Sequence, residues 1–141
     1  MNSTERRVAK QDSSVPAALR SWFVVHFVAD MLFALPLFFA PEQALTLVGW
    51  LAVDPITTRL VGAALFGIGI ESYLGRNADR DRFRGMLNLK VIWSATASIG
   101  IAWSMFEGAH DRPVAGWLFL ATFVAFHALW VYWRIRLGRS S

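Results

Sequence analysis

Six polar or ionisable side chains interrupt long apolar stretches of this sequence, and they are its best candidates for chemistry. They are His26, Asp30, Glu71, Asn88, Lys90 and His127. Carboxylate and imidazole groups can exchange protons or orient one another, and a lysine can neutralise a carboxylate. Ionisable groups are costly inside a membrane and usually mark a ligand or proton site there. We therefore predict a ligand- or proton-binding cluster formed by these six residues.

The spacing of these residues predicts how they face one another. His26 and Asp30 are four residues apart and share a helix face, so the carboxylate can orient the imidazole. Two stripes of residues at four-residue steps are expected to face inward: Ala63, Gly67 and Glu71, and Lys90, Ser94 and Ser98. This arrangement places Glu71 opposite Lys90, where a pair of charges costs less than two separate ones.

Each member of the cluster also has a purely structural interpretation. Lys90 can extend its amine to the nearby membrane interface, and Glu71 can pair with Lys90 or with Arg76. Asn88 and His127 can serve as hydrogen-bonded packing residues. Asp30 is the hardest to explain structurally, because it lies about 15 Å along the helix from the flanking arginine and has a short side chain.

Four long apolar blocks must position these residues, at 22–40, 56–75, 86–106 and 114–133. Each is close to the roughly 20 residues that span a bilayer, and none shows the polar stripe of a soluble helix. The sequence therefore predicts an all-α, polytopic membrane protein. We expect four transmembrane helices in an up-down bundle over residues 16–137, because the connections are short.

The segments between and around these blocks have their own predicted roles. Residues 1–15 are expected to form a disordered cytoplasmic tail, and 138–141 a short one. Pro36 is expected to kink or end the first helix near its outer end. The stretch 41–53 is predicted to form a short interfacial helix. Asp54 followed by Pro55 is expected to cap and begin the second span.

The distribution of basic residues predicts the orientation. Eleven Lys and Arg residues fall in the two tails and the connection between spans two and three, whereas only Arg59 and Arg112 fall on the other side. Short loops rich in Lys and Arg stay in the cytoplasm. Both termini of this multi-pass protein are therefore expected to lie on the cytoplasmic side of a cytoplasmic (inner) membrane. The first block is too long for a cleaved signal peptide.

Composition narrows the possible functions. Cysteine is absent, which excludes disulfides, thiolate metal sites and cysteine nucleophiles. The net charge of +4 reflects arginines flanking the spans rather than a nucleic-acid surface. No metal-binding motif or nucleophile constellation is present, so an enzyme is the less favoured class. His26 and His127, on the first and last helices, could together ligate a b-type haem.

Part of the chain resembles a known group of membrane proteins. The run PLFFAPEQALTLVGW followed by DPITTRLVGAALFGIGIE is similar to the first half of small bacterial four-span proteins of the DoxX-like kind. The matching positions are Pro41, Gly49, Arg59, Gly62 and Gly69. The resemblance covers about half of the chain and implies a membrane partner in quinone-linked redox chemistry. It assigns no catalytic residue.

Three functions follow from these observations. The favoured one is a binding or accessory subunit whose polar cluster holds a small lipophilic ligand or part of a larger complex. The alternatives are a quinone- or haem-linked redox subunit and a proton-coupled small transporter. In each case the lipid bilayer is a partner, and a homo-oligomer or a larger membrane complex is possible. The ligand, partner and oligomeric state stay open.

Overall fold

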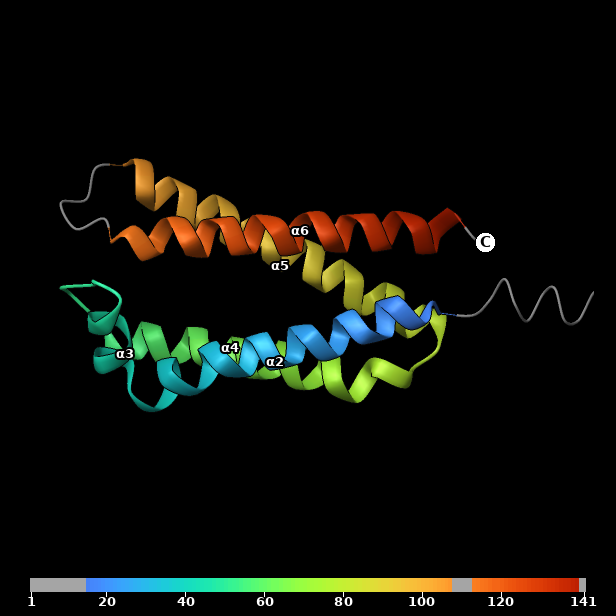
Figure 1. The fold of residues 1–141 in the computed structure, drawn as a ribbon, viewed down its shortest axis with the longest axis horizontal. Helices are drawn as coiled ribbons and strands as arrows, with labels where there is room; N and C mark the ends of the chain where they lie inside the picture. The colour runs from blue at the N-terminus through green and yellow to red at the C-terminus, as the bar shows by residue number, and fades with distance from the viewer. Residues whose placement is uncertain (1–14, 108–112, 140–141) are drawn as a thin grey trace, which may run out of the picture.

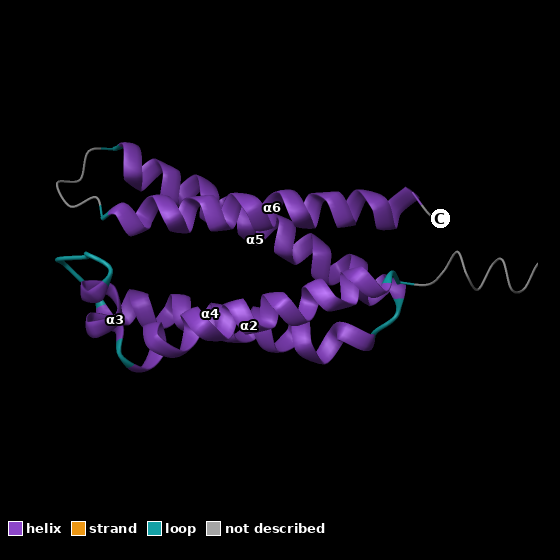
Figure 2. Ribbon diagram, viewed as in Figure 1, coloured by secondary structure: helices purple, strands orange, loops and turns teal. Residues whose placement is uncertain are grey.

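The computed structural model describes residues 15–107 and 113–139, and all regular structure in these ranges is helical (Figures 1 and 2). Four long helices are connected by one short helix and one 3₁₀ turn. In chain order they are α2 (Ala17–Phe39), α3 (Pro41–Leu47), α4 (Pro55–Leu74), η1 (Gly75–Asn77), α5 (Arg80–Phe106) and α6 (Val114–Arg139).

The helices form two hairpins rather than one evenly packed bundle. α2 packs along α4, and α5 packs along α6. Figure 1 shows the hairpins meeting at the end that holds the start of α2, the turn η1 and the end of α6. α5 begins beside the α2–α4 hairpin and then runs obliquely away from it toward α6 (Figure 1). α4 and α5 were predicted to pack as antiparallel neighbours, but they are close only at the end where the hairpins meet.

Three of the helices, α2, α5 and α6, are long and apolar enough to cross a membrane, judged by length and composition within the described ranges. This confirms the predicted class of an all-helical protein with membrane-spanning character. α4 is the fourth predicted span and is 20 residues long, but it is not among these three. Its sequence includes both Arg59 and Glu71, which lower its hydropathy.

The helices extend beyond the predicted spans. α5 begins at Arg80 because Asp79 caps it, accepting a hydrogen bond from the Arg82 backbone N–H at 2.9 Å. α6 continues to Arg139, past the predicted end at 133 and into the predicted tail 138–141. The predicted disordered tail 1–15 lies outside the described residues except for Val15, which is buried.

The helix between α2 and α4 is shorter than the predicted 41–53 helix, because the chain turns at Gly49. α2 continues through Pro36 to Phe39, and α3 ends at Leu47. Gly49 has φ +95°, a conformation that favours glycine. The Gly49 and Trp50 N–H groups donate to the carbonyls of Thr46 and Leu45, a Schellman motif that ends the helix.

The predicted cap at the start of α4 is confirmed: Asp54 is its N-cap residue. The Asp54 side chain accepts hydrogen bonds from the Thr57 hydroxyl and from the Ile56 N–H at 3.0 Å. The hydrogen bond from Thr57, and after it the hydrogen bond from Ile56, hold the pKa of Asp54 below its usual value.

This cap predicts a pH-dependent contribution to stability. A group whose pKa is lowered by folding stabilises the fold at pH values above its unfolded-state pKa, and this stabilisation is lost as the pH falls through the folded-state pKa. Asp54→Ala should therefore lower the melting temperature at pH 7 but not when the wild-type carboxyl is protonated. Equal losses at both pH values would contradict this role.

A compact apolar cluster joins the two hairpins at the end where they meet. Its members come from α2, α5 and α6, together with Val15: Leu19, Phe23, Phe83, Met86, Leu87, Trp130, Trp133 and Leu137. The Phe23 ring lies 4.6 Å from the Phe83 ring and 5.8 Å from the Trp130 ring, centroid to centroid. This cluster fixes the three helices relative to one another and so positions the side chains one turn farther along each helix.

Candidate functional site

The predicted polar residues of α2 and α5 lie directly beside this apolar cluster. His26 follows Phe23 by one helical turn, and Lys90 follows Leu87 by one turn, so both continue the faces that are buried in the cluster. His26, Asp30 and Lys90 are 7%, 6% and 3% exposed. The structure therefore brings three of the six predicted residues into one buried site.

The Lys90 amine is the centre of this site. Its Nζ atom donates to the Ser72 hydroxyl at 2.6 Å and lies 3.0 Å from His26 Nδ1. It also lies 4.9 Å from the centre of the Phe23 ring and 5.1 Å from that of Trp130, where the ring faces stabilise a cation. The amine therefore lies inside the protein, and the interpretation of Lys90 as a residue that reaches the interface is wrong.

His26 Nδ1 also contacts Asp30. An imidazole nitrogen either accepts a hydrogen bond through its lone pair or donates one through its N–H, so Nδ1 cannot accept from Lys90 and donate to Asp30 at the same time. The distance from Nδ1 to Asp30 Oδ2 is 2.9 Å, as the four-residue spacing predicted. Asp30 Oδ2 is nevertheless buried and receives no hydrogen bond within the described structure. Nδ1 therefore accepts from Lys90, and Asp30 Oδ2 remains an acceptor without a donor among the described residues.

The His26 ring is held in place from the side of α6. Its centre lies 5.0 Å from the Phe126 ring and 5.0 Å from the Trp130 ring, both edge-on. These two α6 residues also stack on each other, with centres 5.8 Å apart. The imidazole is therefore fixed by aromatic packing as well as by its polar neighbours.

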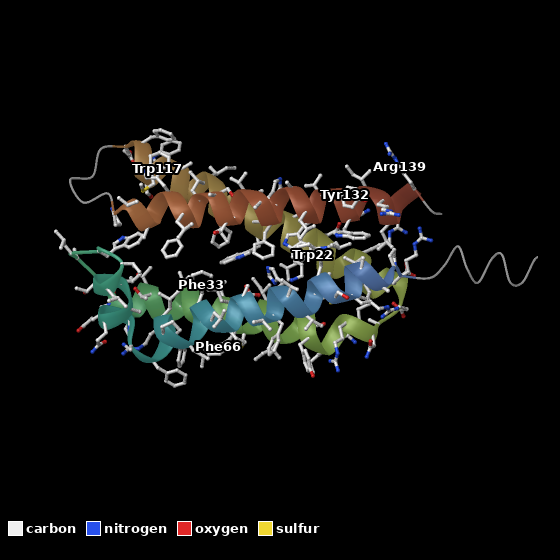
Figure 3. All side chains as sticks on the ribbon, viewed as in Figure 1. Trp22, Phe33, Phe66, Trp117, Tyr132 and Arg139 are labelled. Atoms are coloured by element: carbon white, nitrogen blue, oxygen red, sulfur yellow. The ribbon has the colours of Figure 1, made fainter. Side chains whose placement is uncertain are left out.

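A cavity of about 710 Å³ extends from this polar site along the space between the two hairpins. His26, Asp30, Lys90 and Ser94 contribute its polar end. The rest of the lining is almost entirely aliphatic and aromatic and comes from α2, α3, α4, α5 and α6. Figure 3 shows Phe33, one of the lining residues, on the side of α2 that faces the other hairpin, whereas Phe66 of α4 lies on the outer side of the α2–α4 hairpin.

The far end of the cavity is formed by α3 and the turn that follows it. Trp50 stacks on Phe119 of α6, with ring centres 5.7 Å apart and planes at 22°. Phe33 meets the same Phe119 ring edge-on at 5.8 Å. The cavity thus has an aromatic end near α3 and a polar end at Lys90.

Two of the predicted residues do not join this site. Glu71 does not pair with Lys90: its carboxylate accepts from Arg82 at 2.8 Å, and both side chains are about half exposed. Asn88 Oδ1 accepts from Arg134 Nε at 2.6 Å, also at the exposed end of the molecule. The predicted Glu71–Lys90 pair was wrong because the inward face of α4 is displaced by one residue.

The true inward face of α4 contains Thr58, Gly62, Leu65, Gly69 and Ser72 rather than Ala63, Gly67 and Glu71. A Cβ atom added at Gly69 would lie 2.7 Å from the Asp30 Cβ, which shows how closely α4 approaches α2. The same face presents Ser72 to Lys90. Ser72 was missed because a serine that bonds its own helix backbone, here Ile68 O at 2.6 Å, resembles an ordinary helix residue.

His127 is connected to the site only indirectly, through Ser94. Its Nδ1 lies 3.0 Å from the Ser94 hydroxyl, which in turn donates to the Lys90 carbonyl at 2.7 Å. His127 is not a lining residue of the cavity. His26 and His127 therefore do not face each other across this space, and the geometry gives no support to the haem hypothesis. Within the described ranges, no three His, Cys, Asp or Glu side chains gather where they could hold a metal ion.

The site therefore combines a neutralised pair of buried ionisable groups with a long apolar cavity. A hydrogen-bonding end and an apolar body are the features of a pocket that orients one small molecule. The volume of about 710 Å³ lies in the range of such pockets. No family model, curated protein or solved structure matches this chain, so the resemblance to DoxX-like proteins stays a prediction.

Proposed function

We propose that this protein is a membrane-embedded binding protein for one small lipophilic molecule. The observation that carries the proposal is the cavity between the hairpins, which is apolar along most of its length and ends on Lys90, Asp30 and His26. A hydrocarbon body placed there leaves lipid for a comparable environment, so shape and the polar end decide which molecule binds.

The proposal includes the membrane arrangement. α4 serves as the fourth span, because it is 20 residues long and packs along α2. α3 lies at the outer interface, and both termini are in the cytoplasm of a bacterial inner membrane. Three observations support this orientation: Arg20 of α2 donates to the Arg76 carbonyl, Arg80 of α5 donates to the Leu137 carbonyl of α6, and Arg139 lies at the same end (Figure 3).

Binding, rather than catalysis, is the function that this site supports best. Lys90, His26 and Ser72 bond mainly to one another, so they shape a polar end more than they expose a nucleophile or base. A quinone-linked redox subunit would use the same cavity, with a carbonyl oxygen accepting from Lys90. The identity of the bound molecule separates these two functions.

The test is native mass spectrometry of the protein released gently from its own membrane. We expect a stoichiometric added mass on the wild-type protein. Ala29→Trp, which puts an indole into the cavity beside Asp30, should reduce that adduct at least tenfold, an effect of about 1.4 kcal/mol or more. Ala125→Trp is the matched control, because Ala125 is an exposed α6 residue outside the cavity lining. A clean apo mass, or equal adducts in all three proteins, would contradict the proposal.

A further inference from the structure

The polar end of the cavity restricts the chemistry of the ligand. We infer that the molecule bound there has a neutral, hydroxyl-bearing head group, as in a long-chain alcohol or a phenol. The inference rests on the proposed function and adds the ligand class. It follows from three features of the cavity: its charge, its unused hydrogen-bonding groups and the position of its other hydroxyls.

The charge of the site favours a neutral head group. Lys90 and Asp30 both line the cavity, and the ammonium and the carboxylate together carry no net charge. Their Nζ and Oδ2 atoms both lie about 3 Å from His26 Nδ1, which places them close enough to interact strongly in a low-dielectric site. An anionic or cationic head group would leave one uncompensated charge in the membrane, which is costly.

The unused hydrogen-bonding groups require a head group that donates and accepts. Asp30 Oδ2 is a buried acceptor that receives no hydrogen bond from any described residue. Lys90 has three N–H donors, of which one goes to Ser72 and one to His26, leaving the third for an acceptor in the cavity. A hydroxyl satisfies both sides, because its O–H donates to Asp30 while its oxygen accepts from Lys90.

No other hydroxyl in the lining needs a polar ligand. Thr58 donates to the Asp54 carbonyl at 2.7 Å and Thr122 to the Leu118 carbonyl at 2.9 Å. Thr57 donates to the Asp54 side chain, and Ser94 to the Lys90 carbonyl. The head group therefore lies at the Lys90 end, and the apolar body points toward Trp50 and Phe119.

The experiment uses three probes with the same brominated chain and different head groups: 11-bromo-1-undecanol, 11-bromoundecanoate and 1-bromoundecane. Bromine quenches tryptophan fluorescence, and Trp50, Trp93 and Trp130 line the cavity. The full-length protein is reconstituted in phosphatidylcholine vesicles at a pH where the acid is ionised. Probe dissolved in lipid gives only a component that rises without saturation, so the saturable component reports binding in the cavity.

We expect the alcohol to show the saturable component at a mole fraction about tenfold or more below that of either other probe, because the bromoalkane forms no hydrogen bonds and the carboxylate adds an uncompensated charge beside Asp30. Asp30→Asn leaves Lys90 without its counter-charge. This variant should weaken alcohol binding about tenfold and strengthen binding of the carboxylate, reversing their order. The three-probe series on the wild-type protein decides the question even if that variant does not fold.

The outcomes separate the two proposals. Equal saturable binding of all three probes, or preference for the carboxylate or for the bromoalkane, would overturn the hydroxyl assignment while leaving the cavity as a binding site. The absence of saturable quenching by any probe would overturn both. Saturable binding led by the alcohol, and its reversal in Asp30→Asn, is the result that the structure predicts.

Discussion

Replacing Lys90 with methionine is expected to destabilise the protein by about 3–5 kcal/mol, because it leaves the Asp30 carboxylate buried without a counter-charge. The Lys90 amine is buried, and it bonds Ser72 and His26 as well as neutralising Asp30. Methionine has a similar length and fills the same space, so little of the loss comes from packing. Equilibrium unfolding in mixed detergent micelles measures the difference in free energy.

The double variant Asp30→Asn, Lys90→Met separates charge from packing. It removes both charges, so it should recover much of the stability that Lys90→Met loses, and the two changes should be strongly non-additive. Arg84→Met, on the same helix but outside the network, is the matched control and should stay within about 1 kcal/mol of the wild type. Additive losses in the double variant would show that Lys90 and Asp30 do not act as a pair.

Adding one methyl group at Gly69 is expected to destabilise the α2–α4 hairpin by about 1–3 kcal/mol, the usual effect of overpacking. The new Cβ would lie 2.7 Å from the Asp30 Cβ and 2.9 Å from the Met31 Cε. The Met31 methyl can move, but the Asp30 Cβ is fixed to the backbone of α2, so the helices must separate. Gly69→Ala should also weaken ligand binding, because separation displaces the Asp30 carboxylate.

Gly67→Ala is the control for this prediction, since it makes the same change two residues away on the same helix. An added Cβ at Gly67 has no atom within 4 Å. It should therefore be neutral or stabilise α4 by up to about 1 kcal/mol, the difference in helix propensity. Melting curves of the two variants decide the matter. Similar effects at the two positions would contradict the close approach of α4 to α2.

Sequence pattern alone could predict much of the helical frame, for physical reasons that are local. Apolar blocks of spanning length define α2, α5 and α6, and the Asp54–Pro55 pair defines the start of α4 through capping chemistry. The four-residue spacing of His26 and Asp30 guaranteed their contact. Lys90 and Ser94 were correctly placed on the inward face of α5, where both are buried.

The parts that sequence could not predict depend on how the helices meet. In α4 nearly every residue is small or apolar, so the pattern leaves its rotation open, and an error of one residue exchanged Ser72 for Glu71 beside Lys90. Glu71 instead bonds to Arg82, and Asn88 bonds to Arg134. Both arginines lie on another part of the chain and come close only through the packing of the helices. The cavity is lined by residues from both hairpins, so it depends on how the hairpins pack, which no local pattern encodes.

The most direct test of the binding function is a crystal structure of the protein purified from its own membrane without removal of bound lipophiles. We expect continuous density for one molecule between the hairpins, with its polar end in contact with Lys90 and Asp30 and its body reaching toward Trp50. A structure in which α5 and α6 close directly on α2 and α4, with side chains filling the space and no room for a ligand, would contradict it.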